Sequence, residues 1–277
     1  MFGKEYAKNL DILLQSFGEI NEEYKKKIKK DSLPIEKLKQ LYIFIFGIPE
    51  IGFQVRSAYF EKIMTYYLSN KNFKKILDAG CGIGMYSFLL AKTFPKTIIT
   101  GIDIDKNKLK SCKNIARELK IENIEFANEN VLKLPRVNYD LIVNIDVLEH
   151  VKNYELALKN FYSALNKTGY LYIHAPQPNQ KRIFASFKTW HHEDHVREGI
   201  KKLDLENTLK QLGFVTIFSE ETFGFFGKLS WELNHLMLSK NFILAGITFP
   251  FLLLVTKLDL IMKTKNGLGI AILAKKK

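Results

Sequence analysis

The sequence predicts an α/β fold in which seven strands form one sheet with helices on both faces. First, short apolar runs alternate with helical segments from Lys75 onward, and this alternation is typical of strands connected by helices. Second, a glycine-rich turn follows the first of these runs and precedes a helix. Third, Asn266-Gly267 opens a last apolar run that completes the sheet. A chain of 277 residues is long enough to bury the core of such a domain.

Residues 1–70 precede this alternation, and their spacing of apolar residues predicts an N-terminal helical cap. Apolar residues recur there at the three- and four-residue spacing of a helix face: Leu10, Leu13, Leu14 and Phe17, then Leu38, Leu41, Tyr42 and Ile45. A break at Gly47-Ile48-Pro49 ends the second pattern.

Residues 71–221 form the predicted core of alternating strands and helices. The expected strands are Lys75–Ala79, Thr97–Ile102, Asn123–Ala127, Tyr139–Ile145, Gly169–Ala175 and Phe214–Ser219. The expected helices are Gly84–Phe94, Lys106–Leu119, Tyr154–Leu165 and Lys202–Leu212. Residues 267–277 add the last strand, so residues 222–266 are an insert that is too large for a simple hairpin loop.

The insert contains the most apolar stretch of the chain, Phe242–Val255, which is fourteen residues long. Crossing a bilayer takes about 20 apolar residues, so we expect no ordinary transmembrane helix here. Met1–Asn21 lacks the continuous apolar run of a secretory signal, and we therefore expect a cytoplasmic protein. Four interpretations of the stretch stay open: a lid over a hydrophobic acceptor, an interfacial membrane element, a core extension and a dimer contact.

Composition excludes several classes of protein. Hydrophobic residues at 47% and aromatic residues at 13% exclude a disordered chain, and two cysteines exclude a disulfide scaffold. The net charge of +13 indicates an acidic partner. The last 55 residues contribute 8 − 2 = +6 of this charge, mostly as lysines that flank the apolar stretch. This pattern favours an anionic membrane surface or a lipid-linked acceptor over nucleic acid.

The most informative segment is Leu77–Gly84 (LDAGCGIG), at the end of the first strand. Glycines let the backbone approach a ligand closely, and the following helix presents free N–H groups. Its glycines occupy positions one, three and five, whereas the dinucleotide fingerprint needs one, three and six. Asp103 ends the second strand, 103 − 84 = 19 residues after Gly84. A carboxylate there can accept hydrogen bonds from both hydroxyls of a ribose, so the loop suits a nucleoside ligand without a pyrophosphate.

With these motifs, the sequence resembles the class I S-adenosylmethionine-dependent methyltransferases over about residues 73–213 and the final strand. The resemblance implies S-adenosylmethionine as cofactor, S-adenosylhomocysteine as product and a Rossmann-like sheet. It implies that Asp78 helps to hold the methionine amino group, that Asp103 binds the ribose and that Ile104 packs on the adenine. The remaining cofactor contacts that it implies are Ala79, Gly80, Cys81, Gly82, Gly84, Asn130, Val131 and Asn144. The family often has an acid where this chain has Asn130, whose carbonyl can still accept the adenine hydrogen bond.

A second motif, Asn144–Val151 (NIDVLEHV), follows the fourth strand and should face the transferred methyl group. It lacks the Asn-Pro-Pro-Tyr type of motif found in adenine-methylating members. Asp146, Glu149 and His150 are similar to the Glu-x-x-Glu-His pattern of ubiquinone-type O-methyltransferases, in which a divalent cation positions a phenolic oxygen. The alternatives are a substrate or base role for His150, a catalytic role for Asp146, and a purely structural role for the loop.

A histidine cluster lies between the fifth strand and the next helix, in Trp190–Glu198 (WHHEDHVRE). Histidine titrates near neutral pH, so His191 and His195 are candidates for removing a hydroxyl proton. The phrase around His195 resembles a wall of the acceptor pocket in small-molecule and lipid-pathway methyltransferases. The alternative is a surface loop in which Arg197 pairs with Glu193 or Asp194.

The expected function is therefore S-adenosylmethionine-dependent methylation, with a hydroxyl of a small hydrophobic or lipid-linked acceptor as the favoured target. Three alternatives are an RNA methyltransferase, an NAD-dependent oxidoreductase and a non-catalytic S-adenosylmethionine-binding module. The glycine spacing disfavours the oxidoreductase, and no added RNA-binding domain is evident. Peripheral contact with the inner membrane surface is the partner that the lysines and the apolar stretch favour, while the oligomeric state is not predicted.

Overall fold

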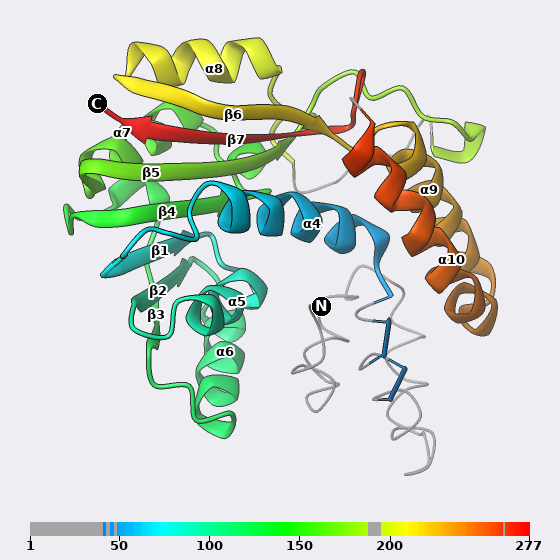
Figure 1. The fold of residues 1–277 in the computed structure, drawn as a ribbon, viewed down its shortest axis with the longest axis horizontal. Coiled ribbons are helices and arrows are strands. Elements are labelled where there is room, and N and C mark those ends of the chain that lie inside the picture. Colours follow the sequence, from blue (N-terminus) through cyan, green and yellow to red (C-terminus); the bar gives the residue numbers. More distant parts are fainter. Residues whose placement is uncertain (1–40, 43–44, 47–48, 188–194, 263) are drawn as a thin grey trace.

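The computed structural model describes residues 41–42, 45–46, 49–187, 195–262 and 264–277, which form a Rossmann-like α/β fold with a seven-stranded sheet (Figure 1). The strands are β1 (Lys75–Ala79), β2 (Ile98–Asp103), β3 (Ile124–Asn128), β4 (Tyr139–Ile145), β5 (Leu165–Pro176), β6 (Phe214–Thr222) and β7 (Gly269–Lys276). The helices are α4 (Ile51–Tyr66), α5 (Met85–Thr93), α6 (Lys106–Glu118), α7 (Tyr154–Ala164), α8 (Lys202–Gln211), α9 (Phe225–Lys240) and α10 (Phe242–Ile261). Short 3-10 turns are η2 (Val131–Lys133), η3 (Leu148–His150) and η4 (Ala185–Phe187). The helices predicted within residues 1–40 lie outside the described ranges.

The strand order is β3-β2-β1-β4-β5-β7-β6, and the fold class predicted from the sequence is confirmed. β1 to β5 pair in parallel, whereas β7 lies antiparallel between β5 and β6. The α9–α10 insert explains this reversal, because it returns the chain to the sheet at the end where β6 finishes. The order of the strands reverses between β1 and β4, and such a switch point is where ligands bind in open α/β sheets.

Two helical layers bury the two faces of the sheet. In β1, Ile76 packs into the layer that contains α4 and α5, while Leu77 packs into the layer that contains α7 and α8. Alternate residues of a strand point to opposite faces, so a strand covered on both sides is apolar throughout. This explains why the continuous apolar runs of the sequence predicted the central strands well.

The insert forms a helical hairpin, and its second helix is longer than predicted. α10 has 20 residues, against the fourteen of the apolar stretch, because Thr256 and Asp259 near its end are buried against the protein and allow the helix to continue. Among the described residues, α10 contains one segment, Ile243–Ile261, that is long and apolar enough to cross a membrane by length and composition. The fourteen apolar residues counted in the sequence therefore underestimated the length of this helix.

α10 contains Pro250 in its interior, and Tyr42 compensates for the missing N–H group. Proline cannot donate to the carbonyl four residues earlier, which is that of Gly246. The Tyr42 hydroxyl donates to this carbonyl oxygen at 2.5 Å. Burial raises the pKa of Tyr42 to about 12, so the hydroxyl keeps the proton that it donates.

This arrangement predicts a dependence between Tyr42 and Pro250 that a double-mutant cycle can measure. Tyr42→Phe leaves the Gly246 carbonyl without its donor and should lower the free energy of unfolding by about 1 kcal/mol. In a Pro250→Ala background the alanine N–H can donate instead, so the same change should cost less than half as much. Urea unfolding of the four proteins measures both costs, and equal costs would contradict the role given to Tyr42.

Candidate functional site

The glycine loop lies at the carboxyl ends of β1 and β4, at the switch point of the sheet. Gly80, Gly82 and Gly84 have φ angles of 83°, 54° and 80°, a region that favours glycine. A Cβ atom on Gly80 would come within 2.4 Å of the Val147 side chain. A Cβ atom on Gly82 would meet no atom within 4 Å. The loop therefore packs closely at Gly80 and presents open backbone at Gly82, where a ligand can approach.

Asp103 fixes the shape of this loop. One of its carboxylate oxygens accepts a hydrogen bond from the Gly82 N–H at 2.8 Å, and the other accepts one from the Asp105 N–H at 2.8 Å. The Ile104 side chain beside it is 71% exposed. A carboxylate next to an exposed apolar side chain at the end of β2 is compatible with the ribose role of Asp103 and the adenine role of Ile104, which stay predictions.

The other residues predicted around the loop are placed as follows. Ala79 and Cys81 are buried, and burial raises the pKa of the Cys81 thiol, so this cysteine stays protonated and unreactive. The Asn144 amide donates to the Ala79 carbonyl at 2.8 Å and so links β1 to β4.

Asn130 caps η2 by accepting from the Leu132 N–H at 2.9 Å, and Val131 is buried behind it. The Asn130 oxygen thus has one lone pair engaged and one left for a ligand.

Asp78 is a buried carboxyl group at the end of β1. It is 2% exposed and accepts a hydrogen bond from the Ser87 hydroxyl at 2.5 Å. Burial raises its pKa to about 7, although the Ser87 hydrogen bond acts in the opposite direction. Near neutral pH the group therefore exists in both protonation states in the free protein.

This pKa predicts a pH-dependent affinity for a ligand that carries an ammonium group near Asp78. As the pH rises through 7, the Asp78 carboxyl loses its proton and can pair with a positive charge, so the affinity for S-adenosylhomocysteine should rise several-fold. Calorimetric titration at several pH values measures this increase. The Asp78→Asn variant has no ionisable group at this position, so the increase in affinity with pH should disappear. An increase that persists in this variant would show that another group causes it.

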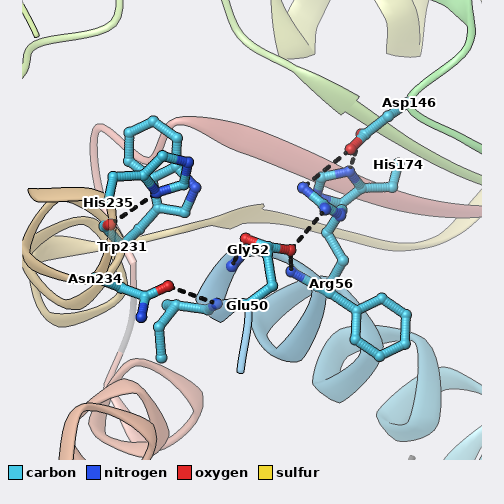
Figure 2. A network of polar contacts seen from close by, with 10 residues as sticks. Glu50, Gly52, Arg56, Asp146, His174, Trp231, Asn234 and His235 are labelled. Atoms are coloured by element: carbon cyan, nitrogen blue, oxygen red, sulfur yellow. Dashed lines mark hydrogen bonds and ion pairs between the residues drawn. The ribbon is translucent and has the colours of Figure 1, made fainter. Parts of the chain in front are cut away.

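A chain of charged and polar side chains connects α4 with Asp146, which follows β4, and with His174 of β5 (Figure 2). Asp146 contacts the His174 imidazole Nδ1 at 2.6 Å and the Arg56 guanidinium at 3.2 Å. Arg56 also reaches Glu50 at 3.4 Å, and His174 Nε2 contacts the Thr222 hydroxyl at 2.9 Å. Burial alone would raise the pKa of Asp146, but His174 and Arg56 lower it to about 2. A carboxylate held in this way is a poor proton acceptor, so these contacts favour a positioning role over catalysis for Asp146.

Glu149, His150 and His195 form a separate cluster at the same edge of the sheet. Their ligating atoms all lie within 4.8 Å of one another, and the two imidazole rings are 4.6 Å apart. Glu149 is buried, its Oε2 atom has no hydrogen-bond partner among the described residues, and burial raises its pKa well above the ordinary value. The structure thus places His195, rather than Asp146, with Glu149 and His150.

Arg197 fastens the loop that carries His195. Its guanidinium donates to the carbonyl oxygens of Leu148, Val151 and Lys152 at 2.6, 2.7 and 2.8 Å. It also lies over the Tyr154 ring, with 4.9 Å between Arg197 Cζ and the ring centroid. These contacts join the His195 segment to the loop after β4. That this segment forms a wall of the acceptor pocket stays a prediction. His191, Glu193 and Asp194 lie outside the described residues.

Sequence reasoning did not find Glu50, Arg56, His174 or Thr222. These residues come from α4, from the position before it, and from β5 and β6, so no local motif connects them. A weak signal was present for His174, because a histidine inside a buried apolar strand needs polar partners.

A family model described as a methyltransferase domain matches residues 70–222. Pavine N-methyltransferase from Thalictrum flavum subsp. glaucum is 31% identical over 104 residues, which are 37% of this chain and 29% of that protein. Ubiquinone biosynthesis O-methyltransferase from Coxiella burnetii is 30% identical over 128 residues, which are 46% of this chain and 52% of that protein. The chain thus spans between about a third and a half of the length of these relatives.

Two solved structures share the fold at low sequence identity. Phosphoethanolamine N-methyltransferase 2 from Haemonchus contortus, in complex with S-adenosyl-L-methionine, aligns with a TM-score of 0.59 and 19% identity. That alignment covers 85% of this chain and 56% of the other. Geranyl diphosphate C-methyltransferase from Streptomyces coelicolor A3(2) aligns with a TM-score of 0.57 and 14% identity, and covers 80% of this chain and 77% of the other.

Proposed function

This chain belongs to the class I S-adenosylmethionine-dependent methyltransferases, and we propose that it methylates a hydroxyl oxygen of a hydrophobic or lipid-linked acceptor. Its cofactor is S-adenosylmethionine, which excludes the NAD-dependent alternative. Three features of the loop support a site for this cofactor: Gly82 presents open backbone, Asp103 places a carboxylate beside it, and Ile104 exposes an apolar side chain. When bound, the cofactor supplies a methyl group on a positively charged sulfur.

The cluster of Glu149, His150 and His195 carries the proposal of a hydroxyl acceptor. A hydroxyl must lose its proton as its oxygen attacks the methyl carbon in line with the carbon–sulfur bond. A histidine of this cluster can take that proton, which contributes roughly 10²- to 10⁴-fold to the rate. A divalent cation held by the three residues would instead lower the pKa of the hydroxyl and orient it. Similarity to a ubiquinone biosynthesis O-methyltransferase supports the same interpretation.

Methylation of an amine is the second candidate, because pavine and coclaurine N-methyltransferases are among the relatives. A cationic amine would need a free carboxylate to bind its charge before it loses a proton and attacks through its lone pair. Asp146 is already paired with Arg56 and His174, and burial raises the pKa of Glu149, which reduces its negative charge. The electrostatics of the described residues therefore favour a hydroxyl over an amine.

An acceptor assay with methyl-labelled S-adenosylmethionine tests the proposal. The purified chain is incubated with matched phenols and amines that have the same hydrophobic substituents, and with total RNA. We expect label in the phenols, with rates at least tenfold above those of the amines. Label only in the amines would establish the second candidate, and label only in RNA would show that the basic surface serves nucleic acid.

Metal binding by the cluster gives a separate prediction. We expect Mn²⁺ to bind at one site, because Glu149 Oε2 has no hydrogen-bond partner among the described residues and two imidazoles lie beside it. The ion would displace the proton that burial favours on Glu149. Glu149→Gln should abolish binding, and His195→Ala should weaken it about tenfold, a factor within the range for loss of a supporting group. Glu155→Gln, an exposed change on the following helix, is the control. Calorimetric titration measures the affinities, and the absence of binding would leave proton transfer as the role of the histidines.

A further inference from the structure

α10 has an inward face that packs against the rest of the described protein and an apolar outward face that the described residues leave exposed. The inward face repeats every three or four residues and is buried: Ala245, Phe249, Leu252, Thr256 and Asp259. The outward face repeats in the same way and is 40–82% exposed: Ile243, Ile247, Phe251, Leu254, Leu258 and Ile261. Because 20 residues of helix rise by about 30 Å, this row of side chains is roughly as long as a small domain is wide.

An uncovered apolar row of this length needs an explanation. A surface helix of a soluble domain ordinarily presents charged or polar residues on its outward face. Contiguous apolar patches beyond a few hundred square ångströms mark sites of interaction with proteins or membranes. Here Lys257 lies next to the row, and the row itself contains no charged residue. The outward face of α10 thus has the composition of an interaction surface.

The charges around the row identify its partner. Residues 223–277 contain two acidic residues, Glu232 and Asp259, which are 0% and 5% exposed. By contrast, Lys240, Lys257 and Lys265 are exposed near the two ends of α10. The surface around the row thus offers lysines and no carboxylate from the hairpin. A second copy would bring lysines against lysines, whereas an anionic lipid surface complements them.

We propose that α10 lies along an anionic membrane surface with its outward face inserted at the interface. The inward face holds the helix against the protein, because Asp259 accepts hydrogen bonds from the N–H groups of Phe226 and Gly227 at 3.1 and 2.7 Å. A helix that crossed the bilayer would have to leave the protein and give up these two hydrogen bonds and the packing of its inward face. A helix that lies in the interface buries its apolar face about 5–10 Å deep and leaves Asp259 in place.

The hairpin emerges beside the candidate site. Gly269, where the chain enters β7 after the hairpin, pairs with Pro176 at the carboxyl end of β5 and with Thr222 at the end of β6. Glu232 of α9 accepts from the N–H groups of Ile183 and Phe184 after β5, at 3.0 and 2.7 Å. A membrane under α10 is therefore on the side of the sheet where the methyl group is transferred. Delivery of the acceptor from this membrane rests on the proposed function, whereas the membrane contact does not.

Vesicle flotation of the full chain tests the contact. The protein is mixed with vesicles of phosphatidylglycerol and phosphatidylcholine, or of phosphatidylcholine alone. We expect binding to the anionic vesicles that is at least tenfold stronger than to the neutral ones and that weakens at high salt. Ile247→Glu combined with Leu254→Glu should reduce it at least tenfold. Leu203→Glu, at a 65% exposed position on α8, is the matched control and should bind as the original chain does.

Three results would overturn the proposal. The first is no flotation of the original chain, the second is undiminished flotation of the double variant, and the third is equal binding to neutral vesicles. Light scattering tests whether a second copy occupies the face instead. If the original chain is a dimer that does not float, and the double variant is a monomer, the face binds a second copy. Retained S-adenosylmethionine binding shows that the variant is folded. Methylation of a soluble phenol is a separate measurement, so a failure of the proposed function would leave the flotation result unaffected.

Discussion

Asp103→Ala is expected to weaken S-adenosylmethionine binding about 100-fold, which corresponds to about 2.7 kcal/mol. Hydrogen bonds to a charged group contribute about 1.5–3 kcal/mol each, and a ribose offers two hydroxyls to this carboxylate. The same carboxylate holds the Gly82 N–H at 2.8 Å and the Asp105 N–H at 2.8 Å, so its removal also loosens the loop. Methyl transfer at low cofactor concentration should fall by the same factor.

Calorimetric titration measures the affinity, and two variants make the result specific. Asp103→Asn keeps one acceptor oxygen but loses the charge. Its affinity for the cofactor should lie between that of the original chain and that of the alanine variant. Asp105→Asn changes the neighbouring carboxylate, which caps α6 through the Asn107 N–H, and asparagine caps a helix equally well. This control should bind the cofactor normally. Unchanged affinity in the Asp103→Ala protein would show that the ribose is held elsewhere.

The cofactor loop could be placed from the sequence because its parts are local. The glycines, the strand before them and the helix after them occupy Leu77–Thr93, and Asp103 follows at the end of the next strand. In a parallel sheet, adjacent strands bring their carboxyl ends together, so the strand assignment alone places Asp103 beside Gly82. The hydrogen bond of 2.8 Å between Asp103 and the Gly82 N–H was not predicted, because it depends on the φ angles of the loop.

The acceptor side could not be placed in the same way. Asp146 was grouped with Glu149 and His150 because the three are close in sequence, but its carboxylate turns toward Arg56 and His174. Asp146 has a φ of 51°, a conformation that short polar residues tolerate and that sequence does not reveal. His195 joins Glu149 and His150 from 45 residues further along the chain, since 195 − 150 = 45. Such contacts depend on tertiary packing rather than on motif spacing.

Arg56→Leu is expected to lower the free energy of unfolding by about 3 kcal/mol at neutral pH. Removing one member of a buried ion pair costs about 3–5 kcal/mol, because the remaining charge loses its partner. The lower end of this range applies here, because the Arg56 and Asp146 side chains are 26% and 29% exposed and are therefore only partly buried. Asp146 would keep its contact with His174 but lose the ion pair that links it to α4.

The pH dependence identifies the cause of this loss. Against the desolvation that would raise it, His174 and Arg56 lower the pKa of folded Asp146 to about 2, below its ordinary value of 3.8. A lowered folded-state pKa contributes stability that is present above pH 3.8 and is lost as the pH falls through 2. The difference between the original chain and Arg56→Leu should therefore be largest above pH 4 and shrink toward pH 2.

Arg56→Lys is the matched control, because it keeps the positive charge but cannot contact Asp146 and Glu50 together. It should lose less than half as much stability as Arg56→Leu and keep the same pH dependence. Urea unfolding followed by circular dichroism between pH 2 and 7 measures all three proteins. A loss in Arg56→Leu that is constant over this range would attribute the effect to the packing of the long side chain on α4. A loss that follows the protonation of Asp146 would show that the cation on α4 holds the carboxylate at the end of β4.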